Sequence, residues 1–310
     1  HVMLDENNKI MDRYISLATA KSQLIGYVNS AEHQLSTESV ATSARLSMFY
    51  DSICDTLSVK SDNEIDLIKK HYQLDSIDLW DLSYYFNKYK KEKGYDKSEF
   101  RNHFTTKKTL PKILDIYEKF FGIKFHKEKA KKVWGLWSSD VKVYRVTKDD
   151  NDLGYIIADI YPRKGKINNA CMMRATSRSN VHDDLACAVV IANLDKHNLS
   201  HNTLVTFFHE FGHAIHQILG CTGWASSSGN ACATDFVECS SQILEEWIWD
   251  PEVLQYLSDT VIPEGILKPL IDTRKTFIGS ELIGQAILGL VSFRYYSDNM
   301  TDISTRRELW

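Results

Sequence analysis

One stretch, L-V-T-F-F-H-E-F-G-H-A-I-H at residues 204–216, constrains the fold and chemistry of this chain more than any other. Its apolar run predicts a buried helix, and helical side chains four residues apart lie on one face. His209 and His213 can therefore present two imidazoles to one metal ion, for which Zn²⁺ is the usual choice. Burying these polar groups without a partner is costly, and a metal ion removes that cost. Glu210, beside the first histidine, then has the position of a general base.

A second helix is predicted downstream, at T-D-F-V-E-C-S-S-Q-I-L-E-E-W. A catalytic zinc takes three protein ligands and leaves one position open. Asp235, Glu238 and Gln242 fall at i, i+3 and i+7, roughly on one face of this helix. We expect Glu238 to be the third ligand, with Glu245 as the alternative. Asp235 or Gln242 is expected to hydrogen-bond a ligand imidazole.

A third histidine follows on the first helix. His216 lies three residues after His213. A fourth protein ligand would fill the open position of a catalytic metal, so we expect His216 to be packed or to orient a ligand. Cys239, next to Glu238, is expected to be a packing residue.

The segments around both helices resemble the thimet oligopeptidase family of zinc metallopeptidases, peptidase family M3. The likeness includes H-E-F-G-H-A-I-H and, after a loop, D-F-V-E-C-S-S-Q-I-L-E-E-W. It extends to L-I-G-Y and A-E within residues 24–32, W-D-L-S-Y-Y at 80–85 and D-I-Y-P-R-K-G-K at 159–166. These motifs cover nearly the whole chain in the family's order. The resemblance implies one Zn²⁺ per chain and short peptides as substrates.

The expected fold class is mainly α with a small mixed β-sheet, part of a zincin-like H-E-x-x-H metallopeptidase catalytic domain. Helical periodicity dominates, and four stretches have the pattern of strands: 141–146, 154–161, 169–174 and 185–193. We expect residues 1–130 to be a helical region that forms part of a channel wall. Residues 131–310 are expected to be the zinc-binding region. The two would form one continuous catalytic unit, truncated at both ends relative to the family.

Two segments are candidates for substrate contact, the first by the resemblance and the second by its small residues. An edge strand near the metal of a zinc peptidase commonly pairs with the substrate backbone, and an open strand edge can add a peptide in this way. Ala186, Cys187 and Ala188 are the candidates, with a plain interior strand as the alternative. The small-residue loop at 223–233, including Gly229, is expected to flex over the cleft or to lie near a substrate backbone. Its alternative is a plain connector.

Composition excludes several other classes of function. The net charge of −4 offers no case for nucleic-acid binding. We expect no membrane span, because the apolar stretch near residues 283–291 is short and interrupted by Gly and Gln.

The six cysteines form no C-x-x-C pair and are expected to be free thiols in a reducing compartment. We expect the cytoplasm, with an organelle as the alternative, since His1 is not a natural start. The oligomeric state stays open.

The expected function is hydrolysis of peptide bonds in short peptides by a zinc-activated water, with Glu210 as the base. The family carries a Tyr- and His-rich segment, whose side chains bind the oxyanion, after the helix that corresponds to residues 277–296. This chain ends at Trp310 before such a segment, and Tyr295 and Tyr296 do not match it. One alternative is therefore a non-catalytic zinc- or peptide-binding remnant, or a split part of a longer peptidase. The other is an exopeptidase that removes C-terminal dipeptides.

Overall fold

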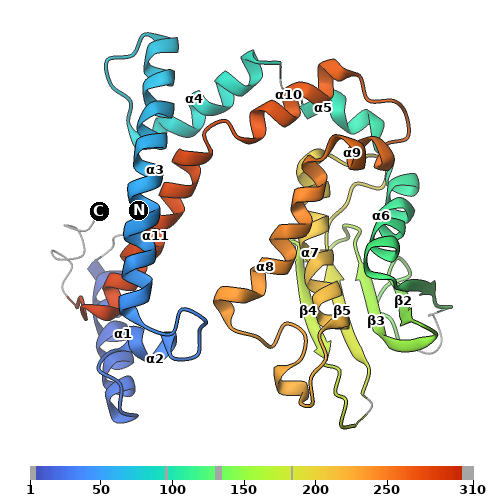
Figure 1. The fold of residues 1–310 in the computed structure, drawn as a ribbon, viewed down its shortest axis with the longest axis horizontal. Helices are drawn as coiled ribbons and strands as arrows, with labels where there is room; N and C mark the ends of the chain where they lie inside the picture. Colours follow the sequence, from blue (N-terminus) through green and yellow to red (C-terminus); the bar gives the residue numbers. More distant parts are fainter. Residues whose placement is uncertain (1–4, 95–96, 130–134, 183, 302–310) are drawn as a thin grey trace. The chain divides into compact units, whose positions relative to one another are not determined.

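The structure, a computed structural model, describes residues 5–94, 97–129, 135–182 and 184–301 (Figure 1). Its contacts divide the chain into two units. The first contains the described residues up to Lys90 and from Lys275 onward, and the second contains Lys91–Arg274. The C-terminal helix thus belongs with the N-terminal helices, an arrangement that the expected division at residue 130 does not include. The single continuous catalytic unit stays a prediction.

The first unit is helical. Its helices are α1 (Asp5–Leu24), α2 (Ser30–Leu35), α3 (Ser43–Tyr72), most of α4 (Leu79–Glu92) and α11 (Ile278–Ser297). The long helices α3 and α11 lie side by side (Figure 1). Glu64 on α3 caps α11, because its carboxylate accepts the backbone N–H of Gly279 at 3.0 Å and of Ser280 at 2.8 Å. The Phe277 ring, just before α11, stacks on Phe86 with ring centroids 4.0 Å apart.

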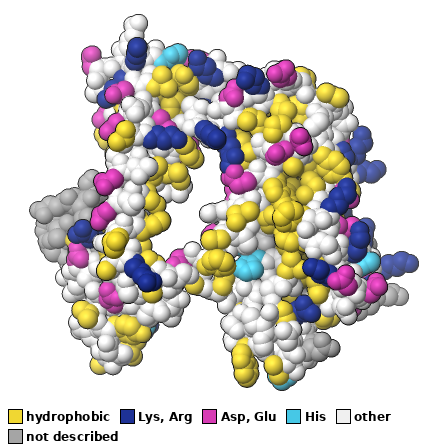
Figure 2. All heavy atoms as spheres, viewed as in Figure 1, with side chains coloured by type: hydrophobic (Ala, Val, Ile, Leu, Met, Phe, Trp, Pro, Cys, Tyr) yellow, Lys and Arg dark blue, Asp and Glu magenta, His cyan; other side chains and the backbone are white. Residues whose placement is uncertain are grey.

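Many large apolar side chains of the first unit are exposed. Among them are Met48, Val59 and Leu288, and Figure 2 shows apolar patches on the surface of this unit.

By length and composition alone, the stretch Glu264–Ser297 could cross a membrane, since an 18-residue window has a mean hydropathy of 1.4 and is 17% buried. Our expectation of no such stretch was wrong in this respect, because the Gly and Gln residues do not lower the mean hydropathy enough. A single stretch of this kind is weak evidence, since core helices of soluble proteins share its composition.

The second unit is built on a five-stranded mixed sheet with the strand order β1-β2-β3-β5-β4. The strands are β1 (Lys124–Lys127), β2 (Lys142–Lys148), β3 (Asn151–Asp159), β4 (Cys171–Thr176) and β5 (Ala186–Ile191). β3 and β5 are parallel, and the other neighbours are antiparallel. The four predicted strands are confirmed, and β1 is additional. The prediction of a mainly helical chain with one small mixed sheet is confirmed.

The helices of the second unit are α5 (Lys97–Phe100), α6 (Thr106–Phe121), α7 (His201–Leu219), α8 (Thr234–Glu245), α9 (Pro251–Leu257) and α10 (Glu264–Arg274), with short 3₁₀ turns η1 (Arg101–His103), η2 (Ala225–Ser227) and η3 (Glu246–Trp249). Of these, α7 lies along the sheet (Figure 1). α7 packs against β5, β4 and β3. Its apolar side chains Phe207, Phe208 and Phe211 are at most 4% exposed, and they join Ile156 and Ala188 of the sheet in one core. Burial of this face fixes α7 on the sheet.

Both ends of α7 are defined by local residues. The N-cap is Ser200, whose side chain accepts the backbone N–H of Thr203 at 3.2 Å. Gly220 ends the helix.

The expectation that residues 186–188 form an edge strand was wrong. β5, which contains them, pairs with β3 on one side and with β4 on the other, so both of its backbone edges are occupied. The side chains of Ala186 and Ala188 are fully buried. The edge strand next to β5 is β4.

Candidate metal centre

Three side chains from α7 and α8 meet at one point. The Nε2 atoms of His209 and His213 are 3.2 Å apart. Glu238 Oε2 lies 3.3 Å from His209 Nε2 and 3.1 Å from His213 Nε2. Among the described residues, these three form the one group of His, Cys, Asp or Glu side chains whose donor atoms could hold a metal ion.

The close approach of α7 and α8 depends on Gly212. A Cβ atom at this position would lie 2.9 Å from the Cα atom of Ser241 on α8. Carbon atoms this close repel strongly, so a larger residue would push the helices apart. The glycine between Phe211 and His213 therefore brings the carboxylate of Glu238 within reach of both imidazoles.

The three donor atoms have a spacing that fits a zinc ion. Bonds of about 2.0–2.1 Å to a tetrahedral Zn²⁺ separate neighbouring ligand atoms by about 3.3 Å. The observed separations are 3.1, 3.2 and 3.3 Å. Two imidazole nitrogens and one carboxylate oxygen also match a known donor set of catalytic zinc sites.

Glu245, at the end of α8, fixes the ring of His209. Its Oε1 atom is 2.6 Å from His209 Nδ1. A carboxylate only accepts hydrogen bonds when it is ionised, so Nδ1 carries the proton and the lone pair of Nε2 faces the donor cluster. This hydrogen bond is also the main reason why the pKa of His209 is raised.

His213 lies deeper than His209. Burial lowers its pKa, against the opposing effect of Glu238, so the ring is held in the neutral form that binds metals. Its Nδ1 atom is buried without a hydrogen-bond partner among the described residues. Of the two ring nitrogens, Nε2 is the one with partners among the described residues, namely His209 and Glu238.

Glu210 points from α7 toward the edge strand. The side chain is buried, with 8% exposed, and its carboxylate lies near the backbone of Met172 on β4. Burial raises the pKa of Glu210, and the carboxylates of Glu238 and Glu245 raise it further, while His209 opposes them. A carboxylate with a raised pKa holds a proton more readily, as a group that accepts and then returns a proton requires.

The other predicted site residues are not part of the donor cluster. Asp235 and Gln242 are exposed on α8, and Glu245 is a carboxylate that orients His209. The sequence contained a signal for Glu245, which lies seven residues after Glu238 and thus on the same helix face. His216 has its Nδ1 atom 3.2 Å from Ser240 Oγ, and burial lowers its pKa.

The residues proposed to contact substrate have packing roles. Ala186, Cys187 and Ala188 lie on the interior strand β5. Gly229 is buried with φ at +59°, and a Cβ atom there would lie 2.4 Å from Gln217 Oε1. A glycine is therefore required at this position by the fold. Substrate contact at Gly229 stays a prediction.

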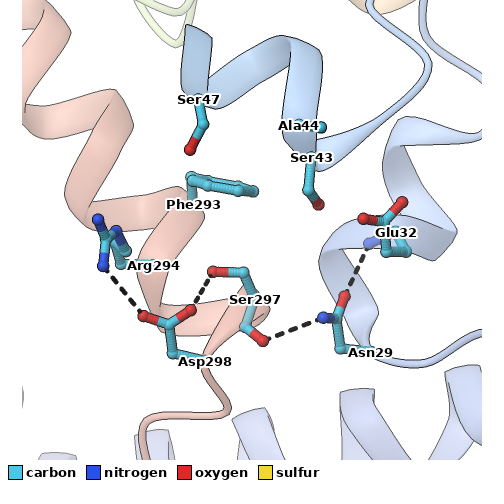
Figure 3. A pocket seen from close by; sticks show the side chains of 9 residues that line it. All are labelled: Asn29, Glu32, Ser43, Ala44, Ser47, Phe293, Arg294, Ser297 and Asp298. Carbon is cyan, nitrogen blue, oxygen red and sulfur yellow. Dashed lines mark hydrogen bonds and ion pairs between the residues drawn. The ribbon is translucent and has the colours of Figure 1, made fainter. Parts of the chain in front are cut away.

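The first unit contains a separate pocket of about 340 Å³ (Figure 3). Its polar groups largely bind one another: Asn29 donates to the Ser297 carbonyl, and Ser297 and Arg294 both contact Asp298. None of the predicted site residues lines it.

Comparison with known proteins assigns the chain to a family. The sequence profile of peptidase family M3 matches residues 3–309. Saccharolysin of Saccharomyces cerevisiae is 31% identical over 87% of this chain and 42% of its own length. Oligopeptidase A of Escherichia coli is 24% identical over 96% of the chain and 46% of its own length. The mitochondrial intermediate peptidase of Vanderwaltozyma polyspora is 25% identical over 97% of the chain and 45% of its own length.

The chain thus spans less than half the length of these three relatives. The match to the family profile nevertheless extends over nearly all of its residues. This chain belongs to peptidase family M3.

Proposed function

We propose that this chain forms the zinc-binding part of an oligopeptidase and hydrolyses peptide bonds in short peptides. The observation that carries the proposal is the meeting of His209, His213 and Glu238 donor atoms within 3.3 Å of one another, beside the buried carboxylate of Glu210. The names of the relatives support the class of reaction, since saccharolysin is matched together with enzymes called oligopeptidase and intermediate peptidase.

His209, His213 and Glu238 would hold the zinc ion, and Glu245 would keep the His209 ring in its binding orientation. A bound zinc ion supplies Lewis-acid polarisation of a carbonyl and of water. Three protein ligands leave room for both. This assignment makes the site a zincin-like centre on the H-E-x-x-H helix α7.

Glu210 is the proposed general base. It takes a proton from the attacking water and returns it to the amine that leaves when the peptide C–N bond breaks. The raised pKa of Glu210, caused first by burial, favours this double role. The carboxylate lies near the Met172 backbone of β4, so the base and the edge strand share one side of the site.

β4 is the proposed strand that pairs with the substrate backbone. It is an edge strand, and most of its residues are exposed, including Met173 with 56% exposed. An edge strand binds an extended peptide through backbone groups without reading every side chain. This replaces the role that we had assigned to residues 186–188.

Hydrolysis of a short internally quenched peptide tests the proposal. The zinc-loaded chain should cleave it, a chelator should abolish cleavage, and added Zn²⁺ should restore it. Product masses from peptides with a free or blocked C-terminus separate internal cleavage from removal of C-terminal dipeptides. A chain that binds one zinc ion but does not cleave at high concentration would overturn the proposal and support a zinc-binding remnant.

A further inference from the structure

One fully buried amide side chain connects the metal helix to the edge strand. Gln217 lies on α7, one turn after His213, and is 0% exposed. Its Nε2 atom donates to the Thr176 carbonyl of β4 at 2.8 Å and to Ser177 Oγ at 3.2 Å. Its Oε1 atom accepts the backbone N–H of Asn230 at 3.0 Å. A carbonyl can only accept and a backbone N–H can only donate, so these partners fix which way the amide faces.

The loop after α7 is shaped around this amide. Gly229 must lack a side chain, because a Cβ atom would lie 2.4 Å from Gln217 Oε1. Its N–H donates to the carbonyl of Gly220 at 3.0 Å. Asn230 donates through Nδ2 to the His213 carbonyl at 3.2 Å. The loop is thereby closed onto the same turn of α7 that carries a predicted metal ligand.

α7 lies along β4. Glu210 on α7 is close to the backbone of Met172 near the start of the strand, and at the end of the strand the Thr176 carbonyl accepts from Gln217. Glu210 and Gln217 are seven residues apart, about 10 Å along the helix axis. Met172 and Thr176 are four residues apart, about 13 Å along the strand. The hydrogen bond from Gln217 fixes the end of the strand on the helix.

The second contact lies just past an irregularity in β4. Arg174 pairs with Ala188, but Thr176 pairs with Cys187, so Ala175 has no residue opposite it in the register. A bulge of this kind turns the strand and changes the direction of its backbone groups. The bond from Gln217 to Thr176 holds the strand where the bulge would otherwise let it shift.

We propose that Gln217 is a positioning residue that sets the register of the open edge of β4 beside the metal centre. Arg174 lies between Met172 and Thr176 on β4, and β4 pairs with β5 along one of its edges, so the other edge is open at this residue. The backbone of Arg174 thus lies between the two contacts and is the part of the edge offered to a peptide. The inference rests on the proposed function, because it assigns Gln217 a role in binding peptide substrate.

Gln217→Met and Gln255→Met form a matched pair for the test. Methionine has a similar length and removes the amide. Gln255 on α9 also binds loop groups, since its Nε2 atom donates to Ser258 Oγ at 3.0 Å and its Oε1 atom accepts from the Ile262 N–H at 3.1 Å. Both variants lose an amide that donates to and accepts from loop groups. An effect seen in Gln217→Met but not in Gln255→Met is therefore due to the position of Gln217 between α7 and β4.

Hydrogen–deuterium exchange of the full zinc-loaded chain gives a readout that does not need activity. Peptides covering residues 172–177 should exchange at least about tenfold faster in Gln217→Met, because the strand loses the side-chain bond that anchors its end and opens more often. They should exchange at the wild-type rate in Gln255→Met. Wild-type exchange of this segment in Gln217→Met would overturn the inference. If this variant does not fold, Gln217→Asn, whose amide is one methylene too short, should show the same faster exchange.

Kinetics separate positioning of the strand from support of the metal helix. Gln217→Met should raise the KM for a short peptide about tenfold and keep kcat within about twofold and one zinc per chain. A lower zinc content or kcat with an unchanged KM would overturn the inference. If the wild-type chain does not hydrolyse peptides, the proposed function fails, while the exchange measurement still decides whether Gln217 holds β4.

Discussion

His209 Nδ1 lies 2.6 Å from Glu245 Oε1, so a carboxylate at the end of α8 holds an imidazole of α7 in one tautomer and one orientation. This bond connects the two helices that carry the three donor atoms. It leaves Nε2 of His209 free to bind a metal ion.

Glu245→Ala should lower zinc affinity about 10- to 100-fold, because the His209 ring loses the partner that orients it. Glu246→Ala is the matched control. Glu246 is the next acidic residue, and its side chain is 55% exposed and pairs with Arg274 instead. Competition with a chromogenic zinc chelator measures both affinities. Equal affinities of the two variants would show that Glu245 does not tune the site.

Glu238→Ala should lower zinc affinity more than Glu245→Ala does, because it removes a proposed ligand. Ile243→Ala, on the same helix with a side chain that is 65% exposed, should bind zinc like the wild type. The same chelator competition provides the comparison. Unchanged affinity in Glu238→Ala would move the third ligand to another carboxylate, with Glu245 as the first candidate.

Glu210→Gln should retain zinc and reduce hydrolysis about 10²- to 10⁴-fold, because the amide cannot accept the proton of water. The side chain keeps its shape and one hydrogen-bond acceptor, so the fold should not change. The rate is measured with the quenched peptide at equal zinc content. Cleavage at the wild-type rate would show that another group is the base.

Gly212→Ala should separate α7 from α8 and destabilise the chain by about 1–3 kcal/mol, since the new methyl group would overlap the backbone of Ser241. Gly284→Ala on α11 is the control. A Cβ atom at Gly284 meets nothing within 4 Å, and alanine should stabilise a helix there by about 0.5–1 kcal/mol. Urea denaturation gives both values. A Gly212→Ala variant as stable as the wild type would contradict the packing argument.

Asp159, at the end of β3, should make stability depend on pH in acid. Burial would raise its pKa, but hydrogen bonds from Arg163, Trp137 and Lys166 outweigh burial and lower the pKa to about 2. A carboxylate whose pKa is lower in the folded state stabilises the fold above its unfolded pKa of about 4, and the stabilisation is lost as the pH falls to about 2. It amounts to about 2 kcal/mol.

The free energy of unfolding of Asp159→Asn tests this dependence. The difference from the wild type should be full at pH 6 and should shrink between about pH 4 and pH 2. Asp140→Asn is a suitable control, because the Asp140 side chain is 49% exposed in its pair with Lys196. A constant difference across this range would mean that the Asp159 charge does not contribute to stability.

Local patterns allowed the helices around the metal centre and four of the five strands to be predicted. The run from Leu204 to Phe208 has the apolar periodicity of a buried helix, and residues 154–161 have the pattern of a buried strand. β1 was missed because K-F-H-K contains one apolar side chain, and its strand form depends on pairing with β2. Such pairing is not encoded within four residues.

The order of the strands could not be predicted locally. β4 precedes β5 in the sequence, so β4 could have paired with β3. Instead β5 lies between β3 and β4 and pairs with β3 in parallel, which leaves β4 at the edge. The error at residues 186–188 arose from this long-range pairing. The contact between Gln217 and Thr176 likewise joins residues 41 positions apart. The donor set was predictable because its spacing within each helix is short.

The measurement that tests the central claim most directly is the zinc content of the purified chain after dialysis against a trace of Zn²⁺. We predict one tightly bound zinc ion per wild-type chain and none in His213→Ala, with His182→Ala binding like the wild type. Stoichiometric zinc in His213→Ala, at wild-type affinity, would contradict the assignment of His209, His213 and Glu238 as the metal centre.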